Sequence, residues 1–96
     1  MADPTLRELT IFGCIRAEQV KVFAKFGDQS GHTDLEWMSI LTEEIGEAAE
    51  CVCKARVHPI DQGVVQPALD NLEYELIQIA TVCVNWLEAI RERDRW

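Results

Sequence analysis

The sequence predicts an all-α fold, in which three long helices per chain form a helical bundle that is completed by dimerisation. Three stretches carry apolar residues every three or four positions, as amphipathic helices do. Polar segments that contain glycine or proline separate these stretches. The nearest candidate for a strand, Val64-Val65, is too short to be one. The 96 residues allow one domain, residues 1–96.

The first helix is predicted to begin at Asp3-Pro4, because Asp is a favoured N-cap and Pro suits the first helical position. Its apolar stripe contains Phe12, Ile15, Val22, Phe23 and Phe26. Gly27 is typical of the position just past the end of a helix. The polar residues 27–32 are then predicted to form a loop.

The second helix is predicted to begin at a capping box formed by Thr33 and Glu36, in which each side chain bonds the backbone N–H of the other residue. This helix should end near residues 56–58, since Pro59 disfavours a helical conformation in the residue before it. Residues 57–66 are predicted to form the second loop.

The third helix is predicted from Ala68 to about Arg91, with Pro67 suited to its first turn. Between Ile77 and Leu87 it is apolar around most of its circumference, and such a helix needs burial on several sides. A chain this short also buries only a modest fraction of its surface on its own. We therefore expect a homodimer or a tetramer.

The charge balance bears on the class of partner. Nine Lys and Arg against seventeen Asp and Glu give a net charge of −8, which argues against a nucleic-acid polymer as partner and is compatible with binding of metal cations. The four cysteines lack zinc-site spacing, so we expect free thiols, most of them in the core, in a reducing cytoplasm. We expect no secretory signal, because residues 1–5 show no basic region followed by an apolar stretch. The apolar run at residues 76–87 is too short to span a bilayer, so no membrane partner is expected.

Acidic residues share a helix face with apolar ones in the second helix. Glu44 and Glu47 point the same way from a face that is otherwise mostly apolar, and Glu43 lies about 40° from Glu47 around the helix axis. Glu50 falls near the solvent edge. In the third helix Glu75, Gln78 and Asn85 form a narrow polar stripe about 80° wide, with Glu73 pointing almost opposite.

Carboxylates in an apolar setting are costly unless a charge or hydrogen bonds compensate them. A divalent cation removes the repulsion between them, and hard oxygen ligands favour Mg²⁺, with Mn²⁺ possible. The alternative is a solvated acidic helix face that binds nothing. A ferritin-like di-iron site is disfavoured, because neither His32 nor His58 lies three residues after a Glu.

Two motifs resemble a known family. Glu43-Glu44-Ile-Gly-Glu47 and, after 27 intervening residues, Glu75-x-x-Gln78 resemble the EExxE…ExxD signature of the MazG-like, all-α nucleoside triphosphate pyrophosphohydrolases. The flanking stretches, Lys25-Phe-Gly-Asp-Gln29 with His32 before the first motif and the helix through Glu88 around the second, resemble the small phage and bacterial group of this family. The resemblance covers roughly residues 20–91.

The resemblance implies Mg²⁺-dependent hydrolysis of a (d)NTP to the monophosphate and pyrophosphate. It implies that Glu44, Glu47 and Glu75 are metal ligands and that Glu43 either supports these ligands from behind or orients the attacking water. Gln78 stands where the signature has Asp, so it offers a neutral carbonyl oxygen in place of a carboxylate.

Four further residues are candidates for substrate binding: Trp37, Lys54, Asn85 and His32. Each has an ordinary alternative, which is core packing for Trp37, a solvated surface for Lys54, contact with a partner helix for Asn85 and a polar loop for His32. The alternative function is a non-catalytic acidic helical dimer that serves as a protein-interaction module and has a degenerate metal site.

Overall fold

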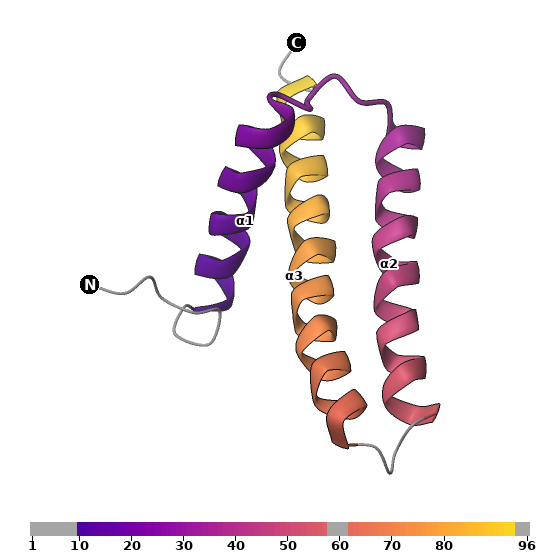
Figure 1. Ribbon diagram of the computed structural model, residues 1–96. Coiled ribbons are helices and arrows are strands. Elements are labelled where there is room, and N and C mark those ends of the chain that lie inside the picture. Colours follow the sequence, from indigo (N-terminus) through magenta and orange to yellow (C-terminus); the bar gives the residue numbers. More distant parts are fainter. Residues whose placement is uncertain (1–9, 58–61, 94–96) are drawn as a thin grey trace, which may run out of the picture.

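The computed structural model describes residues 10–57 and 62–93, with side chains described in 10–54 and 71–93. It contains three helices, α1 (Ile11–Phe26), α2 (Asp34–Val57) and α3 (Gln62–Arg93). Helix α3 lies between the other two and contacts both (Figure 1). The described part of the chain contains no strand, so the all-α prediction is confirmed there. The Cα trace measures 55 × 38 × 20 Å, which is thin for three helices and leaves much of their surface uncovered.

Helix α1 begins later than the sequence predicts. Thr10 has an extended backbone and is the N-cap, and its hydroxyl accepts a hydrogen bond from the backbone N–H of Gly13 at 2.9 Å. A helix that continues from Asp3-Pro4 through this residue is therefore wrong, and residues 3–4 themselves lie outside the described residues. The predicted end is confirmed, because Gly27 caps the helix with a φ of 74°.

The capping box at the start of α2 is confirmed. The backbone N–H of Glu36 donates to the Thr33 hydroxyl at 3.1 Å, and the backbone N–H of Thr33 donates to the Glu36 carboxylate at 3.0 Å. The helix ends at Val57, inside the predicted window.

The predicted loop over residues 57–66 is wrong in its second half, because α3 already begins at Gln62. Residues 58–61 lie outside the described residues. The predicted start is too late because the prediction assigns Pro67 to the first turn of the helix. A helix gains one backbone hydrogen bond for each residue added, and residues 62–66 are included at its start although Gly63, Val64 and Val65 have weak helix propensity.

The core lies between α2 and α3. Its buried members are Trp37, Val82 and Ala89, and Ile40, Leu41 and Trp86 pack around them. At one end of this interface the Asp34 carboxylate accepts hydrogen bonds from both terminal nitrogens of Arg93, each at 2.9 Å, and from the indole Nε1 of Trp86 at 2.9 Å. These bonds tie the start of α2 to the end of α3.

Polar contacts join α1 to α3. The amide Nε2 of Gln19 donates to the Asn85 carbonyl oxygen at 2.8 Å, and the Gln78 amide donates to Glu18 at 2.6 Å. Of the cysteines, which were expected mostly in the core, only Cys14 is buried, while Cys53 is exposed. As far as they are described, the helices contain no segment with the length and apolar character needed to cross a membrane.

Candidate metal centre

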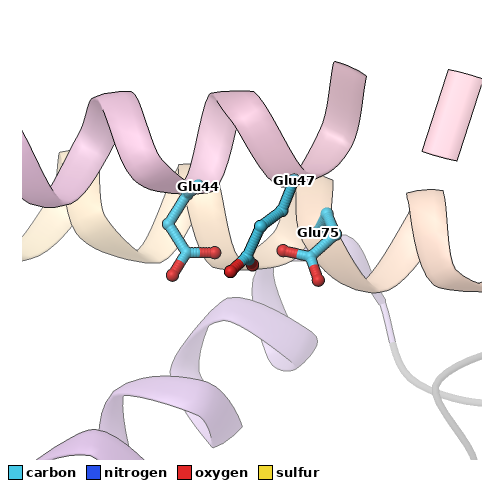
Figure 2. A group of neighbouring side chains, drawn as sticks. All are labelled: Glu44, Glu47 and Glu75. Atoms are coloured by element: carbon cyan, nitrogen blue, oxygen red, sulfur yellow. The ribbon is translucent and has the colours of Figure 1, made fainter. Parts of the chain in front are cut away.

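Three glutamates from two helices converge on one point. Glu44 and Glu47 project from α2 and Glu75 projects from α3 toward them (Figure 2). Each offers one carboxylate oxygen, and these three oxygens lie within 4.8 Å of one another. The structure therefore brings together the three residues that the resemblance implies as metal ligands.

Helix geometry explains why these side chains meet. Glu44 and Glu47 are one helical turn apart and share a face of α2. Ala48 lies one turn after Glu44 and is 8% exposed, so a small residue occupies the contact between the helices. This allows α3 to approach closely enough for Glu75 to reach the pair.

The carboxylates raise one another's pKa. The pKa of Glu44 is raised mainly by burial and also by the charges of neighbouring glutamates, with a hydrogen bond to Glu75 acting in the opposite direction. The pKa of Glu47 is raised by its hydrogen bond to Glu75 and by the charge of that residue. Burial raises the pKa of Glu75 itself, followed by its hydrogen bond to Glu44. Without a cation, the folded chain therefore retains protons here that isolated glutamates would release.

One carboxylate oxygen of the cluster lacks a partner. The Oε2 atom of Glu75 is buried, and among the described residues it has no hydrogen-bond donor. A buried acceptor without a donor is unfavourable, and a cation between the three carboxylates would compensate its charge. The carboxylates, with an amide carbonyl oxygen nearby on Gln78, form a set of hard oxygen ligands that suits Mg²⁺ or Mn²⁺.

Sequence reasoning missed a fourth carboxylate at this centre. Glu18 on α1 is only 8% exposed, and the amide Nε2 of Gln78 donates to its Oε1 at 2.6 Å. The negative charge of Glu18 contributes to the raised pKa of Glu44. Helical spacing in the sequence could have identified Glu18, because Cys14 and Val22 lie one turn before and one turn after it, on the face that meets α3.

The side-chain amide of Gln78 thus offers a donor nitrogen and an acceptor oxygen. Its amide nitrogen is bound to Glu18, and its carbonyl oxygen remains an acceptor. The negative charge that Gln78 lacks is present nearby on α1.

An open cavity of about 420 Å³ contains this cluster. Besides the three glutamates and Gln78, it is lined by residues of α1 and α3, which include Glu18, Lys21, Lys25 and Tyr74. The Lys21 ammonium lies 4.0 Å from the Glu18 carboxylate and is mostly exposed. A cavity that combines acidic ligands with two lysines suits a cation together with an anion bound to it.

The other predicted site residues lie in several places. Glu43 is exposed, and its charge contributes to the raised pKa values of Glu44 and Glu47. Lys54 forms an ion pair with Glu50 at 3.2 Å. Glu50 is exposed, as the predicted position at the solvent edge requires.

The remaining candidates lie near the start of α2 and the end of α3. His32 lies 3.7 Å from the carboxylate of Glu36 and makes an edge contact with the Trp37 ring, with centroids 5.1 Å apart. Trp37 is 2% exposed and belongs to the core, although it also borders a second cavity, as Asn85 does.

Comparisons with known proteins give no match, since no family model fits the chain and neither curated proteins nor solved structures resemble it significantly. The function proposed below therefore depends on the carboxylate cluster and on the resemblance of the two acidic motifs.

Proposed function

We propose that the protein is a Mg²⁺-dependent nucleoside triphosphate pyrophosphohydrolase of the MazG-like kind, which converts a (d)NTP to the (d)NMP and pyrophosphate and removes unwanted nucleotides. The observation that carries the proposal is the convergence of Glu44, Glu47 and Glu75 within 4.8 Å from two helices. The buried, unpartnered oxygen of Glu75 supports a cation at this point. Its expected location is the cytoplasm.

In this proposal the three glutamates hold the metal, and the carbonyl oxygen of Gln78 is an additional neutral ligand. Mg²⁺ or Mn²⁺ held by these residues would supply positive charge against the phosphates and would favour ionisation of water for attack. Glu43 orients the attacking water from the exposed side of α2. The ammonium groups of Lys21 and Lys25, at the cavity wall, bind phosphate oxygens.

We propose that the active form is a homodimer or a dimer of dimers. Apolar side chains remain exposed on α2, where Met38 and Ile45 are 49% and 50% exposed, and on α3, where Leu76 and Leu87 are 53% and 59% exposed. Ile45 points about 160° away from Glu47 around α2, and Leu76 and Leu87 point about 100° and 120° away from Glu75 around α3, so these apolar side chains lie on other helix faces than the carboxylate cluster. A second copy that covers them would leave the cavity open to substrate.

The dimer is tested by light scattering coupled to size-exclusion chromatography. Leu87→Glu should give a monomer, because it places a charge on the proposed contact surface. Phe12→Glu is the matched control, since Phe12 is 83% exposed on α1, and it should leave the dimer intact. A wild-type chain that elutes as a monomer at all concentrations contradicts the proposal.

The activity is tested by identifying products. The protein is incubated with Mg²⁺ and a panel of standard and modified (d)NTPs, and pyrophosphate and orthophosphate are measured separately. We expect pyrophosphate and the monophosphate, with at least a hundredfold loss in Glu44→Gln, because removal of a metal ligand disrupts transition-state stabilisation (about 2.7 kcal/mol or more). Glu73→Gln is the matched control, because this exposed glutamate lies outside the cluster on α3. Absence of turnover in Mg²⁺ and in Mn²⁺ favours the alternative of an acidic interaction module.

A further inference from the structure

A second cavity lies between α1, the turn after it, the start of α2 and the last part of α3, and it shares the lining residue Val22 with the cavity of the carboxylate cluster. Its volume is about 350 Å³. Its wall combines the apolar side chains of Val20, Phe23 and Trp37 with the polar groups of Gln19, Asn85 and Glu88. Phe23 is 66% exposed, so its ring is accessible to a ligand. An accessible aromatic ring beside a few fixed polar groups is typical of a site for a planar, polar ring.

The polar groups of this cavity have a defined pattern of donors and acceptors. Both amide hydrogens of Gln19 are used, one by the carbonyl oxygen of Asn85 at 2.8 Å and one by a carboxylate oxygen of Glu88 at 3.1 Å. These bonds turn the carbonyl of Asn85 toward Gln19, so its NH₂ group remains as a donor. The second carboxylate oxygen of Glu88 remains as an acceptor. The cavity wall therefore carries an amide donor and a negatively charged acceptor on residues one helical turn apart.

The two cavities are arranged along the same pair of helices. Asn85 lies two turns after Gln78 on one face of α3, which is about 10 Å along the axis. On α1, Glu18 and Gln19 are consecutive and line the first and the second cavity respectively. A nucleotide whose phosphates are at the carboxylate cluster can therefore extend its base toward Asn85 and Glu88.

We propose that this second cavity binds the base of the nucleotide and selects bases that carry an exocyclic amino group over thymine and uracil. The inference rests on the proposed function for the identity of the ligand. In cytosine the amino group donates to the Glu88 carboxylate, and the adjacent ring nitrogen accepts from the NH₂ group of Asn85. Adenine, through its 6-amino group and N1, and guanine, through its 2-amino group and N3, also place an exocyclic amino donor beside a ring-nitrogen acceptor. In the same orientation uracil and thymine place O4 against the Glu88 carboxylate and N3–H against the NH₂ group of Asn85, so both contacts are repulsive.

The test compares 2′-deoxycytidine with 2′-deoxyuridine, which differ in the two groups that face Glu88 and Asn85: an amino group and a bare ring nitrogen in cytosine, a carbonyl oxygen and a ring N–H in uracil. Both nucleosides lack phosphate, so binding is measured in EDTA by NMR titration of the whole chain, without metal or turnover. We expect 2′-deoxycytidine to bind about tenfold more tightly, as one good donor–acceptor pair allows. Glu88→Gln and Asn85→Asp should each reduce this ratio to about twofold or less, because each changes one member of the pair.

Glu50→Gln is the matched control, since Glu50 is an exposed glutamate paired with Lys54 on α2, and the preference should persist in it. Equal binding of the two nucleosides, no binding of either, or a preference that survives in both cavity variants would overturn the inference. If the chain hydrolyses dCTP and dUTP equally and shows no nucleoside preference, base selection fails while the hydrolase proposal stands. If the preference is present and no nucleotide is hydrolysed, the cavity stands and the hydrolase proposal fails.

Discussion

The sharpest prediction concerns the thermal stability of Glu75→Gln with and without Mg²⁺. In the wild type a cation that binds only the folded chain stabilises it by mass action, by about 1.4 kcal/mol at ten times the dissociation constant. For a domain of this size each kcal/mol raises the melting temperature by about 4–8 °C. We therefore expect an increase of about 5–10 °C under that condition.

The variant changes the chain in two opposite ways. Without metal it removes a charge from three carboxylates whose oxygens lie within 4.8 Å of one another, a separation at which two unit charges repel by about 1 kcal/mol with water-like screening. Metal-free Glu75→Gln should therefore melt about 4–8 °C above the metal-free wild type at pH 8. With Mg²⁺ it should gain little, because a ligand is missing.

The assay is differential scanning fluorimetry at fixed protein concentration, with EDTA or increasing MgCl₂. Glu73→Gln removes the same charge two residues away on an exposed part of α3 and should behave as the wild type. The reasoning is refuted if Glu75→Gln keeps the full response to Mg²⁺, or if Glu73→Gln loses as much of it. A gain in metal-free stability alone would establish the repulsion without the metal site.

Three further predictions follow from the structure. The pKa values of the clustered glutamates are raised above 4.5, so the folded chain holds protons that the unfolded chain releases. The contribution of these glutamates to metal-free stability should therefore fall as the pH rises through the raised pKa values. Chemical denaturation of wild type and Glu75→Gln at pH 5 and pH 8 measures the difference. Hydrogen bonds from Arg93 and then from Trp86 lower the pKa of Asp34, so the contribution of Asp34 to stability is present above the ordinary value of 3.8 and is lost as the pH falls through the lowered pKa. Asp34→Asn should lower the melting temperature by a few degrees at pH 7. An unchanged melting temperature would contradict the role of these hydrogen bonds between α2 and α3. Gly27→Ala should lower the free energy of unfolding by about 1–3 kcal/mol, because a φ of 74° is strained for a residue with a side chain, although an added Cβ meets no atom within 4 Å. Gly46→Ala, in the middle of α2, should raise the free energy of unfolding by up to about 1 kcal/mol. A urea titration in which both variants change stability in the same direction would refute the backbone argument.

The sequence by itself determined the local structure where one side chain or one backbone position decides it. The Thr33–Glu36 capping box and the stop at Gly27 are examples, because each depends on groups within a few residues. The sequence was insufficient at the starts of α1 and α3, where several positions compete. Thr10 lies between the predicted start of α1 and its apolar stripe, and residues 63–65, just after the start of α3, have weak helix propensity.

For the candidate site, helical spacing predicted which acidic residues share a face of one helix. It grouped Glu44 with Glu47, and the resemblance added Glu75. Only the tertiary structure decided which faces meet, because contact between residues about 30 positions apart depends on how α2 packs against α3 and is not encoded in local periodicity. The same packing of α1 against α3 placed Glu18 beside Gln78 and Gln19 beside Asn85, across about 60 residues of chain, with bonds of 2.6 Å and 2.8 Å. The candidate ligands were thus predicted from the sequence, whereas the fourth carboxylate and the second cavity arise from contacts between helices far apart in the chain.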